Sequence, residues 1–297
     1  MENNLSRNSI ICKGQKILSG KGVETNLLAF NAMAAIFSFI MIVTNGMFLF
    51  VYIARPILRC KVKILYLMLC LSDFVYGLFA FSLACILTSN KLDKQCHIMD
   101  LFISCGFLFT TLGVLSIGAI ILETYLAVVK PFTHANRRDN KTVAKILTVA
   151  WIASIFLVTT LKLWLGQLWN IYSITLWIFM ILLLCFIIFV QTKIYLCVKR
   201  SSMLRSRDRY AVITTFMLTL TYVLSFVPVS ILGIYSKFSS HKGVLESYVL
   251  PWAYIMIGIN CITDPVICTM RTPALREKVV ELFNHPGNAR TNPQIEH

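Results

Sequence analysis

Long apolar stretches alternate with short polar, mostly basic segments along almost the whole chain. A helix that crosses the bilayer needs about 20 consecutive, predominantly apolar residues. Seven stretches reach this length, so the pattern predicts seven membrane-spanning helices. The predicted spans are Leu27–Ile53, Ile64–Leu87, Ile98–Val129, Val143–Leu165, Ile171–Val198, Val212–Tyr235 and Leu245–Met270.

Short connections between these spans favour one compact, all-α seven-transmembrane helix bundle over separate domains. We expect residues 1–26 to form an N-terminal tail, residues 27–270 the bundle, and residues 271–297 a tail that begins with a short helix. Apolar side chains recur at helical spacing in that last segment, which is typical of an amphipathic helix lying on a membrane surface. These side chains are Leu275, Val279, Leu282 and Phe283.

The composition agrees with a membrane protein, since 57% of the residues are hydrophobic and only 14% are charged. Soluble domains carry about 25% charged residues. The net charge of +15 could indicate a nucleic-acid-binding protein. However, most lysines and arginines lie in connections that share one side of the membrane. By the positive-inside rule, the N-terminus is extracellular and the C-terminus is cytoplasmic. We therefore expect a multi-pass plasma-membrane protein surrounded by lipid, with no nucleic-acid partner and with Asn4 as the exposed glycosylation sequon.

Histidines and cysteines do not occur at the spacings of a zinc site, and most cysteines lie within apolar stretches. There they are expected to pack as small hydrophobic side chains. No nucleophile, base and metal-ligand set converges in the sequence. These patterns predict a protein that is not an enzyme and has no metal or organic cofactor.

Two acidic residues fall inside predicted spans, Asp73 in the second and Asp264 in the seventh. A charge at the bilayer centre costs at least about 3 kcal/mol, so such residues face the bundle interior. Asn45 and Asn260 add carboxamide groups at similar depth. Because Asn260 and Asp264 are four residues apart, they share one helix face.

Two interpretations of these polar residues remain open. They form a neutral, hydrogen-bonded network that holds helices together, or a hydrated pocket that binds a sodium ion between Asp73 and Asp264. Pro228 and Pro265 should kink the sixth and seventh spans, because each removes a backbone donor. Such kinks are either packing features or hinges of a bundle that changes shape.

Several short motifs occur in order, each on a different span. The third span ends in LETYLAVVKPF, which resembles the D-R-Y-L-A-V pattern of rhodopsin-like (class A) G-protein-coupled receptors. The resemblance covers nearly the whole chain and implies a receptor that binds an extracellular ligand and acts on a heterotrimeric G protein. The C-terminal part, with the short fourth-to-fifth connection, resembles melanocortin and adenosine-type receptors. The other matching positions are Asn45, Asp73, Trp151, Tyr195, Pro228 and the run from Asn260 to Pro265.

Three positions depart from the family pattern. Thr124 replaces the third-span arginine, Phe226 the sixth-span tryptophan, and Cys268 the seventh-span tyrosine. Threonine cannot supply the five hydrogen-bond donors of a guanidinium group. The sequence therefore leaves open whether the protein couples to a G protein. A non-coupling scaffold or decoy receptor is the alternative, followed by an ion-translocating protein. The resemblance assigns coupling and switching to Glu123, Thr124, Tyr125, Tyr195, Pro228, Pro265 and Cys268.

The resemblance also implies a ligand pocket near the outer ends of spans three, five, six and seven. Gly258 stands where opsins carry the retinal-binding lysine, and Gly106 where amine receptors carry an acid, so neither retinal nor a biogenic amine is expected. Cys12 and Cys96 would both face the oxidising exterior, where they either form a disulfide or remain two free thiols. Candidate pocket residues, whose apolar character is also typical of a packed core, are Gly106, Phe107, Phe226, Ser230, Tyr254 and Gly258.

Overall fold

The structure is a computed structural model. It describes residues 9–12, 15–18, 21–54, 61–88, 96–130, 140–165, 169–200, 206–239 and 244–271, together with Arg276 and Val280.

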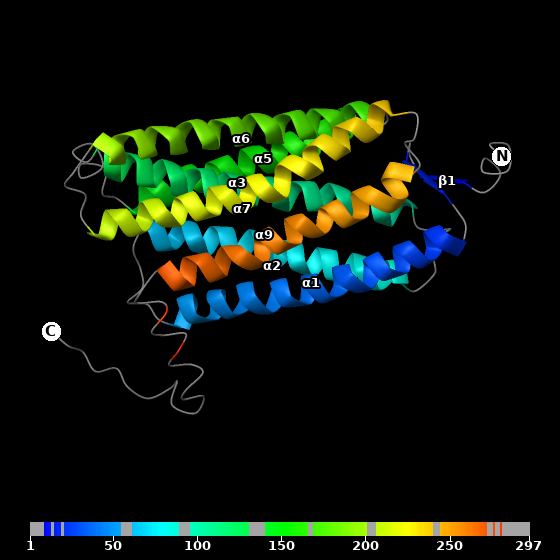
Figure 1. The fold of residues 1–297 in the computed structure, drawn as a ribbon, viewed down its shortest axis with the longest axis horizontal. Coiled ribbons are helices and arrows are strands. Elements are labelled where there is room, and N and C mark those ends of the chain that lie inside the picture. Colours follow the sequence, from blue (N-terminus) through cyan, green and yellow to red (C-terminus); the bar gives the residue numbers. More distant parts are fainter. Residues whose placement is uncertain are drawn as a thin grey trace.

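In the described part of the chain, seven long helices lie side by side in one bundle, which confirms the predicted fold (Figure 1). The last of them, α9, continues directly from a short π-helical segment, η4 at Leu245–Val249. The long helices are α1 (Lys21–Ala54), α2 (Lys61–Thr88), α3 (Cys96–Val129), α5 (Asn140–Leu165), α6 (Trp169–Arg200), α7 (Ser206–Phe238) and α9 (Leu250–Arg271).

Six of these helices are long and apolar enough to cross a membrane, by length and composition. In α5, the apolar stretch whose side chains the structure describes is Lys145–Thr160. Its helix still runs from Asn140 to Leu165, so about 26 residues at 1.5 Å each match the thickness of a bilayer core with its margins.

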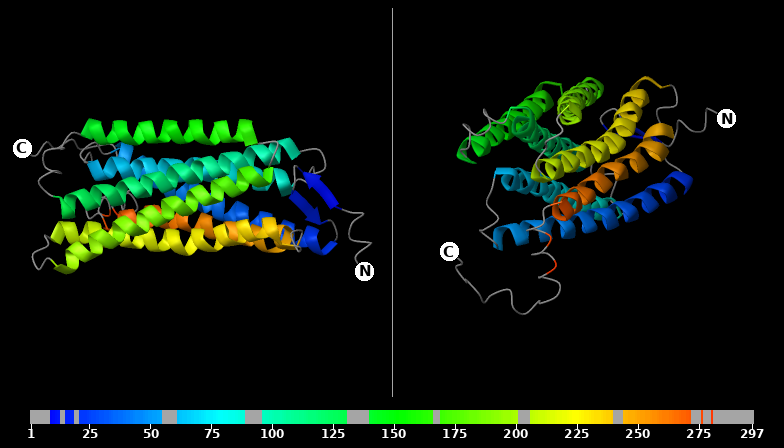
Figure 2. Two further views of the ribbon diagram at one scale, coloured as in Figure 1. Left: turned by 90° about the horizontal axis from the view of Figure 1, so that it is seen from above. Right: turned by 60° about the vertical axis from the view of Figure 1, so that its left-hand side comes forward.

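The helix α3 occupies a central position in the bundle. It packs against α2, α5, α6 and α7, whereas α1 packs against α2 and α9 on one side (Figure 2). The second and last helices also touch, so α1, α2 and α9 form one group. The residues of α1, α2 and α9 that point inward can therefore meet, although they lie far apart in the sequence.

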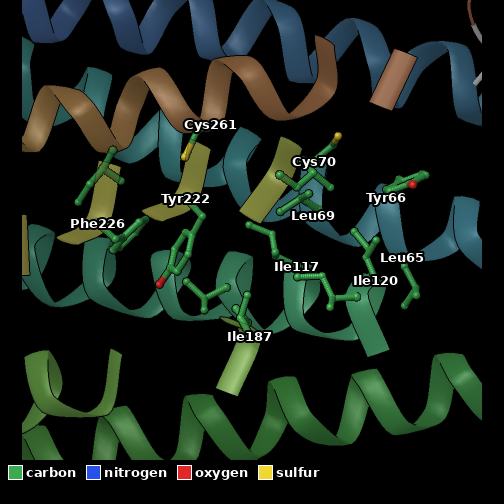
Figure 3. Close-up of a cluster of buried hydrophobic side chains, with 14 of the residues drawn as sticks. Leu65, Tyr66, Leu69, Cys70, Ile117, Ile120, Ile187, Tyr222, Phe226 and Cys261 are labelled. Atoms are coloured by element: carbon green, nitrogen blue, oxygen red, sulfur yellow. The ribbon is translucent and has the colours of Figure 1, made fainter. Parts of the chain in front are cut away.

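Apolar side chains are divided between the interior and the outer surface of the bundle. Leu69 and Ile121 are completely buried, whereas Phe156 is 71% exposed and Leu182 is 63% exposed. In water, so many exposed large apolar groups would be unfavourable, but they suit a surface that faces lipid. The buried set draws on every long helix that the structure describes, and Figure 3 shows part of it.

Serine and threonine side chains inside the helices donate hydrogen bonds to their own helices. Ser116 Oγ donates to the Leu112 carbonyl at 2.9 Å, and Thr219 Oγ1 to the Thr215 carbonyl at 2.8 Å. Ser225 does the same toward Thr221. Because lipid offers no partner for a hydroxyl, these local bonds make short polar residues tolerable within the spans.

The described part of the N-terminal segment contains a β-hairpin. Strands β1 (Ser9–Cys12) and β2 (Gln15–Leu18) pair antiparallel, with Ser9 opposite Leu18. The hairpin lies at the end of the bundle where α1 and α9 begin (Figure 1). Asn4, the side chains of Cys12 and Cys96, and the apolar positions of the predicted amphipathic helix lie outside what the structure describes.

Candidate functional site

Asn45 joins the first and last helices. Its side chain is fully buried, and Nδ2 donates to the Met41 carbonyl in α1 and to the Cys261 carbonyl in α9, both at 3.0 Å. The bond to Met41 uses a carbonyl one turn back in the same helix, while the bond to Cys261 crosses between helices. One carboxamide thus fixes the relative position of α1 and α9 in the middle of the bundle.

The two acidic side chains lie beside this contact. Asp73 of α2 is 4% exposed and Asp264 of α9 is completely buried, and they are close enough to interact electrostatically. Asn260 Nδ2 donates to Asp264 Oδ2 at 3.2 Å, so these residues do share one helix face. The Cys261 thiol donates to the Asp73 carboxyl group.

Space beside Asp73 comes from a glycine of α3. A Cβ atom built at Gly113 would lie 3.4 Å from Asp73 Oδ1 and 3.5 Å from Ser72 Oγ. Ser72 itself donates to the Leu69 carbonyl at 2.7 Å. Both distances are ordinary van der Waals contacts, so Gly113 places the α3 backbone directly beside the Asp73 carboxyl group.

Four buried oxygen atoms in this cluster have no hydrogen-bond partner among the described residues. Ionised carboxylates only accept hydrogen bonds, and an unsatisfied buried acceptor costs about 1–3 kcal/mol. Protons on the acids, or a small cation with a preference for oxygen, would compensate these atoms. The four are Asn45 Oδ1, Asp73 Oδ2, Asn260 Oδ1 and Asp264 Oδ1, which we call the polar core.

The residues assigned to coupling do not gather into one polar cluster in the described part of the chain. Thr124 is buried, and its Oγ1 donates to the Ile120 carbonyl at 3.0 Å, within its own helix. Glu123 is also buried, whereas Tyr195 of α6 is 59% exposed. Tyr125 packs against the core, and Cys268 is completely buried within it.

Of the candidate pocket residues, Phe226 lies in the hydrophobic core. Its ring packs on Tyr222, with 4.2 Å between the ring centroids (Figure 3). Tyr222 is completely buried, and its hydroxyl group has no hydrogen-bond partner among the described residues. Ser230 is buried one turn further along α7, just beyond Pro228, which lies inside that helix as Pro265 lies inside α9.

Phe107 and Tyr254 meet through Trp177 of α6, a residue that the sequence analysis missed. The Trp177 ring contacts Phe107 edge-on, with 5.2 Å between centroids, and stacks on Tyr254 at 6.5 Å. Gly106 faces Tyr76, while a Cβ atom at Gly258 would meet nothing within 4 Å. No local pattern marks Trp177, because it lies in a long apolar stretch whose inward face depends on the neighbouring helices.

Clusters of the usual metal-ligating side chains are absent from the part of the chain that the structure describes. No group of three or more His, Cys, Asp or Glu side chains there is arranged to hold a metal ion. The thiols of Cys70, Cys261 and Cys268 are free and buried.

Comparison with protein families gives a match over most of the chain. Residues 44–267 match the family model described as 7 transmembrane receptor (rhodopsin family). The match begins just before Asn45 and ends beyond Pro265, so it includes the whole polar core. A comparison with curated proteins found no match.

Replacing Asn45 with alanine is expected to destabilise the bundle by about 1–2 kcal/mol, because it removes an interhelical hydrogen bond and leaves the Cys261 carbonyl without this donor. Thermal unfolding of the purified protein in detergent measures the effect. Ser82→Ala is the control, since Ser82 bonds only within α2 at an exposed position. Equal unfolding temperatures for the two variants would contradict the bridging role of Asn45.

Proposed function

The chain belongs to the rhodopsin family of seven-transmembrane receptors, and on that basis we propose that it transmits an extracellular ligand signal to a heterotrimeric G protein. The family match is the observation that carries the proposal. The polar core supports it, because its residues connect α1, α2 and α9 in the middle of the bundle. A ligand changes a receptor equilibrium only by binding one conformation better than another. Buried polar groups with unmet hydrogen-bonding capacity favour such alternative conformations.

The protein is a multi-pass membrane protein. We propose that it resides in the plasma membrane with the N-terminus and the β1–β2 hairpin outside, as the distribution of lysine and arginine predicts. Membership of a receptor family supports a non-enzymatic role. The closer resemblance to melanocortin and adenosine-type receptors stays a prediction, as do the pocket, the excluded retinal and amine ligands, and the Cys12–Cys96 pairing.

Thr124 gives a specific reason to keep a second function, a receptor-like scaffold that does not activate G proteins. Its hydroxyl group is buried and bonded to its own helix, so it offers no long cationic side chain at the end of α3. Cys268, buried where family members carry tyrosine, adds a second departure on α9. The two functions differ in one measurable activity, nucleotide exchange.

The purified wild-type receptor, reconstituted in lipid, is expected to accelerate nucleotide exchange on at least one class of heterotrimeric G protein above the rate without receptor. Thr124→Ala should keep this activity, because it removes only a hydroxyl bonded within α3. If the wild type is inactive on all classes and Thr124→Arg gains activity, the scaffold function is correct and the signalling proposal is wrong.

We also propose that the polar core binds a sodium ion between Asp73 and Asp264. The unpartnered oxygens of both acids and of Asn260 suit a hard cation, which prefers oxygen ligands. Sodium chloride should then raise the unfolding temperature of the wild type relative to choline chloride at equal ionic strength, because ligands stabilise the state they bind. Asp73→Asn should abolish the difference. If sodium and choline give equal stability in the wild type, the acids are held as a protonated network.

A further inference from the structure

Trp177 of α6 packs against α3, α7 and α9 through Phe107, Gly233 and Tyr254. Its side chain is only 3% exposed, and its indole lies edge-on to Phe107 and stacked on Tyr254. On the α7 side it rests on Gly233. A Cβ atom there would lie 2.7 Å from Trp177 Cε2 and 2.8 Å from Nε1, closer than real Cβ contacts. The lack of a side chain at position 233 is therefore what admits the indole.

The surroundings of this ring are aromatic and uncharged. Phe107 and Tyr254, which contact its ring, and Gly233, on which it rests, carry no charge. Lys162 Nζ of α5 donates a hydrogen bond to Ser104 Oγ of α3 at 2.7 Å. Ser104 lies two residues before Gly106 in α3. A charged ligand in the place of the indole would lose its hydration without gaining an ionic partner from these contacts.

Gly258 of α9 leaves open space next to this stack. It is four residues from Tyr254 and therefore lies on the same helix face, and a Cβ atom built on it meets nothing within 4 Å.

We propose that Trp177 occupies an indole-sized slot between Phe107, Gly233 and Tyr254, and that the receptor's ligand is an uncharged, planar aromatic molecule that takes the place of this side chain. The inference rests on the proposed receptor function, because it names the class of ligand for that pocket. Aromatic rings prefer the edge-on and offset-stacked arrangements that Phe107 and Tyr254 already provide. Ligand binding must also displace the indole, which makes Trp177 a determinant of both affinity and selectivity.

The test uses indole as the probe and the full-length receptor in detergent. Trp177→Ala leaves an apolar cavity, and such cavities bind small aromatic molecules of matching shape. Indole should raise the apparent Tm of this variant by about 5 °C at saturation. In the wild type the resident side chain competes, so the Kd for indole should be at least ~10-fold weaker. Tryptamine and indole-3-acetate, which carry opposite charges on the same ring system, should stabilise Trp177→Ala much less than indole.

A second pair of variants locates the binding. Adding Gly233→Ala to Trp177→Ala places a methyl group where the ring would rest, and should weaken indole binding at least ~10-fold. Adding Gly118→Ala is the matched control, because a Cβ atom there would meet only Ile187 at 4.0 Å. Indole binding should then be unchanged.

Three results would overturn the inference: a folded Trp177→Ala variant that does not bind indole, equal affinity in wild type and variant, or charged analogues that bind as tightly as indole. Each is read from binding to the receptor alone. A receptor that binds indole as predicted but fails to drive nucleotide exchange would leave this inference standing and remove only the proposed signalling.

Discussion

The structure depends on burying two carboxyl groups inside a bundle whose outer surface faces lipid. Asp73 and Asp264 are almost wholly removed from solvent, on helices that touch each other. Their attraction to Asn260 and Cys261, and the Asn45 bridge to α9, orient them. The buried oxygen atoms that these contacts leave without a hydrogen-bond partner must be compensated by protons or by a cation, since lipid supplies neither hydrogen bonds nor charge. The packing of α1, α2 and α9 is therefore linked to the ionic state of one small region.

In the proposed receptor, this linkage would give the fold a means of changing state. The same helix that holds Asp264 carries Tyr254 toward one end and Cys268 toward the other, so a movement of α9 affects the slot around Trp177 and the region beyond the polar core together. Pro265 immediately follows Asp264 and removes a backbone hydrogen bond at that point of the helix. A ligand that displaces an indole from the stack on Tyr254 would act directly on this element, which is the differential contact that a conformational shift requires.

The sequence predicted the spans well because hydrophobic length is a local property, and it placed Asp73 and Asp264 in the interior because a buried charge in lipid has few alternatives. The contents of the outer pocket could not be predicted. Whether Trp177 points inward depends on the rotation of α6 against α7, and its partner Gly233 lies 56 positions away, a pairing that no periodicity within one helix encodes. The orientation of the Thr124 hydroxyl toward its own helix likewise required the tertiary structure.

The central claim, that Asp73 and Asp264 act as one coupled unit, is tested most directly by a double-mutant cycle. Unfolding stability would be measured for the wild type, Asp73→Asn, Asp264→Asn and the double variant under identical detergent and salt conditions. Because the two acids lie in one buried cluster, the account predicts a coupling energy of about 1 kcal/mol or more between the two substitutions. Additive effects, with the double variant equal to the sum of the single ones, would show that the two acids are independent and would contradict the account.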